Sequence, residues 1–135
     1  MISTELATRL RDAGLTWKPT EGDRFHIDAP ELAAEVFTVS TLTIEAHHFP
    51  TGTVLGFNGT TEWALDSVDI EDTLWLPRED QLRDLLGRTF RSMVRDGESY
   101  IVEADLLGQR RTFTATDPAD AYGRALLALV ELAGE

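Results

Sequence analysis

The clearest start and stop signals of the chain lie in residues 74–87, Leu74-Trp75-Leu76-Pro77-Arg78-Glu79-Asp80-Gln81-Leu82-Arg83-Asp84-Leu85-Leu86-Gly87. Pro77 lacks a backbone donor and fixes φ, so it favours an extended Leu76 before it and the start of a helix. Acidic residues follow in the first helical turn, where the helix dipole favours them. An apolar stripe of Leu82, Leu85 and Leu86 leads to Gly87, a typical terminator. The stretch therefore predicts a strand followed directly by a helix.

Length and charge limit the classes of protein to consider. The chain has 135 residues, which predicts a single domain, residues 1–135, with one ordinary core. It carries 24 acidic and 12 basic residues, a net charge of −12 that argues against direct binding to nucleic acid. Residues 1–77 hold 13 acidic and 4 basic residues (net −9), and residues 78–135 hold 11 and 8 (net −3). A compositional bias of the genome is one explanation of this acidity, and an acidic surface for a basic protein partner is the other.

The sequence lacks several features, and their absence excludes or disfavours disulfides, thiolate metal sites and membrane-spanning segments. There is no cysteine, which excludes disulfides and thiolate ligands. The chain has no apolar run of membrane-spanning length, and its first residues lack the order of a signal peptide. We therefore expect a cytoplasmic protein with no membrane segment and no cofactor, and we leave open whether it forms a homo-oligomer.

The first half reads as a helix followed by short strands. Ser3 is placed to cap a helix that runs to about Ala13. Alternation at Phe25 and Ile27 predicts a strand, and dense β-branched and aromatic residues predict further strands at about 36–39, 42–48 and 53–57. After these, Thr60 or Thr61 could cap a short helix that ends near Val68.

The first hairpin of the second half has two candidate turns. Strands are expected at about 89–94 and 98–107. A two-residue turn at Asp96-Gly97 would bury charge, whereas a three-residue loop over residues 95–97 would pair Val94 with Glu98. We favour the second turn, because it gathers on one core face Phe90, Val94, Tyr100, Val102 and Ala104.

The sequence also predicts a second hairpin in this half and a helix at its end. A turn at Gly108-Gln109 would pair Ala104 with Phe113 and Val102 with Ala115 on the inner face. The last helix should have Asp117 as its cap and Pro118 at its first position. Its buried stripe is predicted to contain Ala121, Tyr122, Ala125, Leu126, Leu129 and Val130.

The order of these elements predicts an α+β fold, with antiparallel sheets packed by helices. Each half, residues 1–73 and residues 74–135, reads as helix, strands and helix. A duplication of one α-β-α unit is therefore one interpretation of the layout, and chance similarity is the other.

The most enzyme-like cluster is Glu45 with His47. Both side chains would project from the same face of a strand and, with a third ligand such as His26, could hold a metal for a small hydrolase. Histidines at a surface or sheet edge are the alternative. Motifs for a P-loop, a dinucleotide site, an EF-hand and a nucleophile elbow are all missing.

Two tryptophans flank an acidic connection and predict a groove for a protein partner or ligand. The proposed lining is Trp63, Trp75, Asp66, Asp69 and Arg78. The alternative is that both indoles simply anchor a core.

Residues 56–68, Gly56-Phe57-Asn58-Gly59-Thr60-Thr61-Glu62-Trp63-Ala64-Leu65-Asp66-Ser67-Val68, and the segment from Leu74 to Leu82 resemble a family of short actinobacterial proteins. These proteins often carry the label pilus assembly protein CpaE, and the resemblance spans nearly the whole chain. It implies an accessory role linked to pilus assembly or secretion, without the ATPase-like domain of the larger CpaE protein. It implies no functional residues.

The missing catalytic motifs and the charge asymmetry together favour a non-enzymatic binding or regulatory module for a protein partner. The accessory role in pilus assembly and the hydrolase using His47 and Glu45 are the alternatives.

Overall fold

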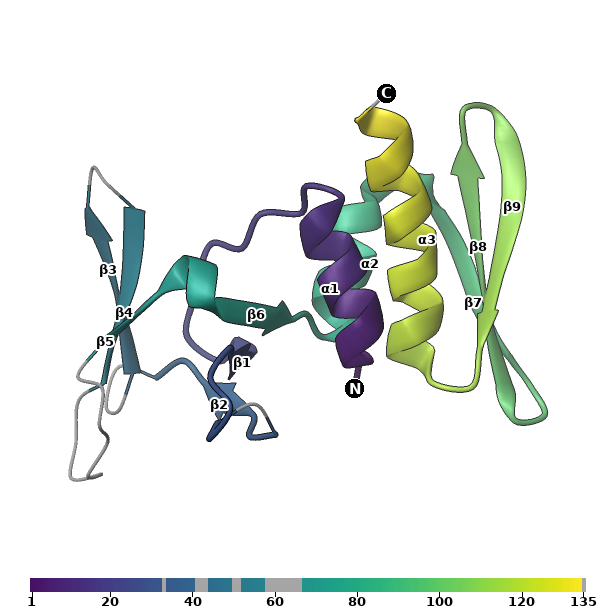
Figure 1. Ribbon diagram of the computed structural model, residues 1–135. Coiled ribbons are helices and arrows are strands. Elements are labelled where there is room, and N and C mark those ends of the chain that lie inside the picture. The colour runs from purple at the N-terminus through teal and green to yellow at the C-terminus, as the bar shows by residue number, and fades with distance from the viewer. Residues whose placement is uncertain (33, 41–43, 50–51, 58–66, 135) are drawn as a thin grey trace. The chain divides into compact units, whose positions relative to one another are not determined.

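The computed structural model describes residues 1–32, 34–40, 44–49, 52–57 and 67–134. The chain divides into two compact units: unit 1 comprises Met1–Thr16 and Leu76–Glu135, and unit 2 comprises Trp17–Trp75 (Figure 1). The C-terminal boundary of unit 2 lies close to the predicted division after residue 73. The first helix, however, groups with the second half of the chain, which the sequence did not indicate.

Three helices form one layer of unit 1: α1 (Thr4–Asp12), α2 (Glu79–Leu86) and α3 (Pro118–Ala133). The predicted caps are confirmed, since Ser3 Oγ accepts a hydrogen bond from Leu6 N at 3.3 Å, and Asp117 Oδ1 accepts one from Ala119 N at 2.8 Å. Helix α3 packs against α1, α2 and the neighbouring sheet (Figure 1). This central position explains why α3 is apolar on most of its surface.

The contact between α1 and α3 depends on Gly123. A Cβ atom at this position would lie 2.7 Å from Leu6 Cδ2 and 3.2 Å from Ile2 Cδ1, both in buried side chains. The absence of a side chain therefore allows the two helices to approach closely.

We expect Gly123→Ala to lower the free energy of unfolding of unit 1 by about 1–3 kcal/mol, because overpacking outweighs the gain of about 1 kcal/mol in helix propensity. Urea denaturation followed by circular dichroism measures the change. The double variant Leu6→Ala/Gly123→Ala should lose less free energy of unfolding than the two single variants lose together, since the shortened side chain makes room for the new Cβ atom. Additive effects would contradict the close contact.

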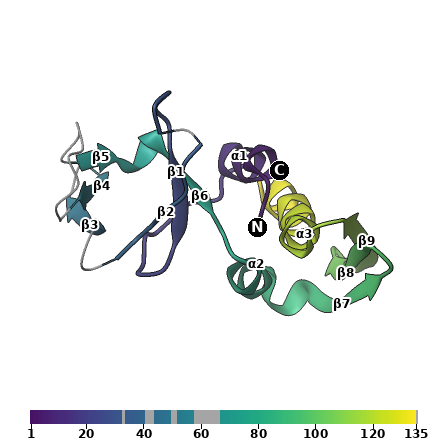
Figure 2. The ribbon, with the colours of Figure 1, turned by 90° about the horizontal axis from the view of Figure 1, so that it is seen from below.

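A three-stranded antiparallel sheet completes unit 1, in the order β7 (Phe90–Asp96), β8 (Ser99–Leu106) and β9 (Gln109–Ala115). The helices lie on one face of this sheet (Figure 2). No other described element of unit 1 covers the opposite face. The predicted α+β class, with helices packed on antiparallel strands, is confirmed.

The first hairpin has neither of the two predicted registers. Asp96 pairs with Ser99, and the turn is Gly97-Glu98 with φ +61° at Gly97 and no positive φ at Glu98, as in a type II′ turn. The pairing therefore differs from the predicted match of Val94 with Glu98, and Val94 lies on the outer face, 53% exposed.

A β-bulge explains why this prediction was wrong. The register shifts between Phe90 and Ser92, so Arg91 is an extra residue in β7. Phe90 pairs with Ala104 and Met93 with Val102, so these side chains share the inner face although they are three residues apart. The predicted register rests on strict alternation along the strand, which one inserted residue reverses.

The second hairpin turns one residue earlier than predicted. Leu106 pairs with Gln109, and the turn residues Leu107 and Gly108 have φ +50° and +78°, as in a type I′ turn. The pairing is shifted by two residues, so Val102 meets Phe113 rather than Ala115. A shift of two residues keeps each side chain on the same face of the sheet, so the predicted division between inner and outer residues is confirmed.

Leu107 combines positive φ with 84% exposure, which is unfavourable for a leucine. We expect Leu107→Asn to raise the free energy of unfolding by about 1 kcal/mol, because Asn-Gly is the preferred pair in a type I′ turn. Thermal denaturation measures the effect. Leu107→Val is the matched control and should destabilise, since a β-branched residue tolerates positive φ least.

Unit 2 consists of short strands. One sheet has the order β2 (Phe37–Thr38), β1 (Arg24–Ile27) and β6 (Thr73–Leu76), and the other has β3 (Ile44–Phe49), β4 (Gly52–Phe57) and β5 (Ser67–Asp69). The short η1 (Ile70–Asp72) links β5 to β6. The predicted strands are confirmed apart from their ends. Most of the predicted helix at residues 60–68 lies outside the described residues, and its last two residues form part of β5 instead.

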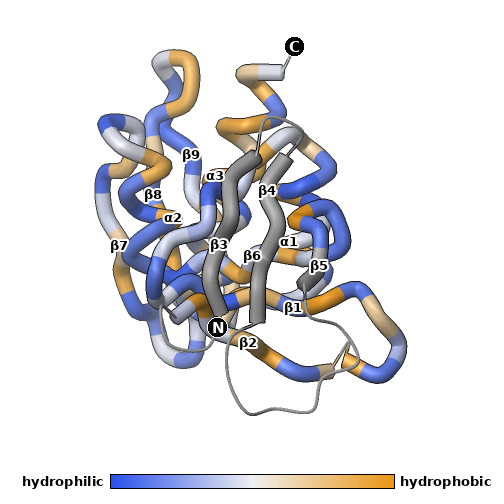
Figure 3. Tube along the Cα trace, turned by 90° about the vertical axis from the view of Figure 1, so that its left-hand side faces the viewer, coloured by the Kyte–Doolittle hydropathy of each residue, from blue (hydrophilic) through white to orange (hydrophobic). Residues whose placement is uncertain are grey.

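The core of the β1–β2 region follows the predicted alternation. Phe25 and Ile27 are buried, together with Phe37 and Val39 on the neighbouring segment, and Trp17 packs against them. Figure 3 shows hydrophilic and hydrophobic residues interspersed along the helices and along β1, β2 and β6–β9, as expected where each element has one buried side.

The stretch from residue 74 to residue 87 folds largely as predicted. Strand β6 leads into α2 through Pro77, and Gly87 ends the helix with φ +56°. Leu82 and Leu86 are buried, but Leu85 is 43% exposed, so the predicted stripe is narrower than expected. None of the described helices is both long enough and apolar enough to cross a membrane.

Candidate functional site

The structure describes only some residues of the predicted groove. Trp63 and Asp66 lie outside the described residues. Trp75 lies on β6 and Asp69 is exposed at the end of β5, both within unit 2. Arg78 belongs to unit 1, where it precedes α2 and forms an ion pair with Asp80 at 3.2 Å. The groove as a whole therefore stays a prediction.

The proposed metal cluster is likewise only partly described. Glu45 and His47 both lie in β3. Their side chains do not belong to the part of the chain that the structure describes. His26 Nδ1 lies 2.7 Å from the carbonyl oxygen of Glu35, which can only accept, so this nitrogen donates. Among the described residues, no three metal-ligating side chains gather at one point.

The best-defined polar site of unit 2 is the buried carboxylate of Asp23, which is 1% exposed. Its Oδ2 atom accepts hydrogen bonds from Trp17 Nε1 at 2.9 Å and from Thr20 N at 3.0 Å. The backbones of the same two residues are also hydrogen-bonded, since Asp23 N donates to Thr20 O at 3.1 Å. The carboxylate thus holds the turn before β1 and orients the indole of Trp17.

Trp17 in turn stacks on Trp75. The ring centroids are 6.4 Å apart and the planes differ by 10°. Trp17 also lies 5.3 Å from the ring of Phe25, which extends the aromatic contact into the core. The indole nitrogen of Trp75 is buried and has no hydrogen-bond partner among the described residues. This arrangement favours the alternative reading of Trp75 as a core anchor.

Sequence reasoning missed Trp17 and Asp23. The signal that was available is the pair Thr20 and Asp23, whose spacing is typical of a side chain that bonds to a nearby backbone amide.

The charge asymmetry coincides with the two units. Unit 2 holds 11 acidic and 2 basic residues (net −9), whereas unit 1 holds 13 and 10 (net −3). Many of the acidic side chains of unit 2 are exposed: Glu21, Asp28, Glu31, Glu35, Asp69, Glu71 and Asp72. Asp28 N donates to Asp72 O at 2.7 Å, so two of these residues lie on adjacent segments.

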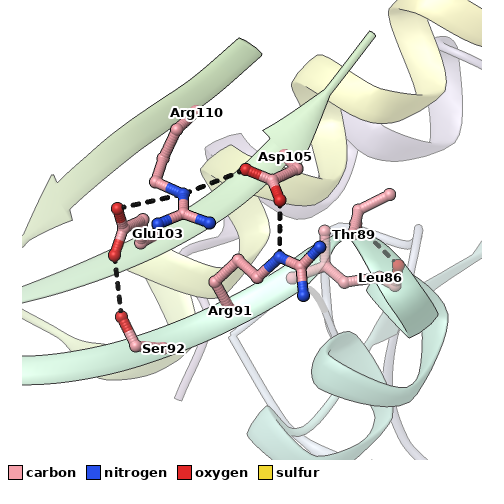
Figure 4. Close-up of polar contacts among 7 residues, drawn as sticks. All are labelled: Leu86, Thr89, Arg91, Ser92, Glu103, Asp105 and Arg110. Atoms are coloured by element: carbon pink, nitrogen blue, oxygen red, sulfur yellow. Dashed lines mark hydrogen bonds and ion pairs between the residues drawn. The ribbon is translucent and has the colours of Figure 1, made fainter. Parts of the chain in front are cut away.

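The uncovered face of the unit 1 sheet carries an ionic network (Figure 4). Asp105 on β8 accepts hydrogen bonds from Arg110 Nε on β9 at 3.0 Å and from Arg91 Nε on β7 at 2.5 Å. Arg110 also lies 3.4 Å from Glu103, whose other oxygen accepts a hydrogen bond from Ser92 Oγ. One carboxylate therefore links all three strands, and the bulge at Arg91 places its side chain on this face.

This network shifts two pKa values. Hydrogen bonds from Arg110 and then Arg91 lower the pKa of Asp105, and the hydrogen bond to Asp105 raises the pKa of Arg110. The pair is a structural link on a solvated surface, since both groups are stabilised in their charged forms.

We expect the network to make stability depend on pH in acid. The folded pKa of Asp105 is lowered from 3.8, so its contribution is present above 3.8 and is lost as the pH falls through the folded value. The difference in urea midpoint between the native protein and Asp105→Asn should be largest at neutral pH and should shrink below pH 3.8. A difference that does not depend on pH would contradict this assignment.

Comparison with known proteins gives no match: no family model fits the chain, and no curated protein or solved structure is significantly similar to it. The resemblance to the short actinobacterial proteins labelled CpaE therefore stays a prediction.

Proposed function

We propose that this chain is a non-enzymatic binding module whose unit 2 binds a basic protein partner. The observation that carries the proposal is the coincidence of the charge asymmetry with the two compact units, net −9 against net −3. Exposed carboxylates at this density attract a basic surface and speed its association.

The acidic side chains of η1 and the segments beside it are the first candidates for the contact. Asp69, Glu71 and Asp72 are exposed on a short connection, and Asp28 is tied to it through its backbone. Exposed ion pairs contribute about 0.2–1 kcal/mol each, so affinity would depend on several contacts together.

The test is capture from a lysate of the native host with the full chain, at low and moderate salt. The variant Asp28→Asn/Asp69→Asn/Glu71→Gln/Asp72→Asn removes four charges from unit 2. The matched control Glu79→Gln/Asp84→Asn/Glu98→Gln/Glu131→Gln removes four exposed charges from unit 1.

We expect the captured partner to be basic, to elute as salt rises, and to bind the unit 2 variant about 10- to 100-fold more weakly. The control variant should retain most of the affinity. Recovery of no partner at either salt concentration, or equal losses for both variants, would contradict the proposal.

A further inference from the structure

β9 is an edge strand, and part of its outer backbone edge is unpaired among the described residues. β9 is the last strand of its sheet, and Leu106 pairs with Gln109 across a two-residue turn. In this register the odd-numbered residues of β9 bond to β8, and residues 110, 112 and 114 direct their N–H and C=O groups outward. Arg124 Nη1 donates to Thr114 O at 2.6 Å, which independently confirms this orientation.

This edge is also basic, in a chain that is otherwise acidic. Residues 109–116 contain Arg110 and Arg111 and no acidic residue. Arg110 is neutralised by the acids of β8, but neither Arg111 nor Arg124 has a carboxylate partner among the described residues. Arg111 instead lies over the ring of Phe113, with Cζ 5.2 Å from its centroid.

Arg111 and Arg124, which have no carboxylate partner among the described residues, lie on the same side of the edge. Arg111 pairs with Ala104, whose side chain is on the inner face of the sheet, and Arg124 projects from α3, which packs on that face. The edge therefore combines outward-facing backbone groups at residues 110 and 112 with positive charge along one side, while Thr114 O already accepts from Arg124. Both features match an extended chain whose acidic side chains recur at every second residue.

We propose that the outer edge of β9 binds an extended acidic peptide as a fourth strand of the sheet. The peptide backbone bonds to Thr112 and its neighbours, and its carboxylates contact Arg111 and Arg124. A second copy of β9 is a poor occupant, because it would bring two basic strands together. This surface belongs to unit 1, so its test is independent of the acidic surface proposed for unit 2.

The probe is an eight-residue peptide that alternates Glu with Val or Thr, titrated into the isotope-labelled full chain and followed by NMR. A peptide with Lys in place of Glu is the control for charge, and inorganic phosphate is the control for simple anion binding. We expect shifts confined to β9 and the region of Arg124, and slower exchange of the Thr112 amide proton.

Three variants separate the contributions. Arg111→Gln and Arg124→Gln should each weaken binding about 2- to 5-fold, whereas Arg83→Gln, an exposed arginine on α2, should not. Thr112→Pro removes an outward donor and should weaken binding at least about tenfold, because proline is tolerated on an edge strand but cannot donate. Thr112→Val keeps the donor and should retain affinity.

Three results would overturn the proposal. The Lys peptide could bind as tightly as the Glu peptide, or phosphate at equal charge could displace the Glu peptide. The Thr112 amide could also remain unprotected in the saturated complex. The exchange measurement uses the unmodified protein, so the outcome does not depend on whether Thr112→Pro folds.

Discussion

Replacing Asp23 by alanine is expected to lower the free energy of unfolding of unit 2 by about 3–5 kcal/mol. The carboxylate is buried, and its Oδ2 atom accepts hydrogen bonds from Trp17 Nε1 and from Thr20 N. Alanine would leave two donors unsatisfied, each at a penalty of about 1–3 kcal/mol. Hydrogen exchange of the backbone amides of unit 2 and urea denaturation measure the loss.

Asp23→Asn is the informative control. Its amide oxygen can take the place of Oδ2 and accept both hydrogen bonds, so we expect a loss of only about 1–2 kcal/mol, from weaker neutral bonds. Trp17→Phe removes one of the two donors and keeps the ring, and should lie between the two Asp23 variants. Equal effects for alanine and asparagine would show that the carboxylate does not hold the turn.

Trp75→Ala is expected to destabilise unit 2 by about 3–5 kcal/mol, through lost burial and the cavity left beside Trp17. The parallel stack, with centroids 6.4 Å apart, would lose one ring. Urea denaturation followed by circular dichroism gives the change in stability.

Trp75→Phe distinguishes packing from polar contact. Phenylalanine retains an aromatic ring and removes a buried N–H group that has no partner among the described residues. The smaller ring area and the removed penalty oppose each other, so we expect a change within about 1 kcal/mol. A large loss for Trp75→Phe would show that the indole nitrogen has a partner, and an unchanged stability for Trp75→Ala would show that Trp75 is free for binding.

Local rules predicted those parts of the fold that depend on neighbouring residues. The caps at Ser3 and Asp117 and the alternation of Phe25 with Ile27 are of this kind, because each follows from the chemistry of a few adjacent residues. The strand-to-helix order at Pro77 was predicted for the same reason. The α+β class followed from the order of these elements.

Features that depend on tertiary contacts were not predicted. The bulge at Arg91 satisfies the inner face and the ionic network of the outer face together, and no local rule requires it. A leucine at positive φ runs against backbone preference, so the turn at Leu107 was placed one residue too late. For the candidate groove, the contact of Trp75 with Trp17, which is distant in the sequence, was not predicted.

The aromatic residues are divided between the units in a way that gives each unit its own optical signal. Trp17, Trp63 and Trp75 are the only tryptophans and all belong to unit 2, whereas the only tyrosines, Tyr100 and Tyr122, belong to unit 1. Selective excitation of indole fluorescence therefore reports on unit 2 alone. The parallel stack of Trp17 on Trp75 should add an exciton couplet to the circular dichroism spectrum, which disappears when unit 2 unfolds. The unmodified chain can thus report the unfolding of one unit without a label.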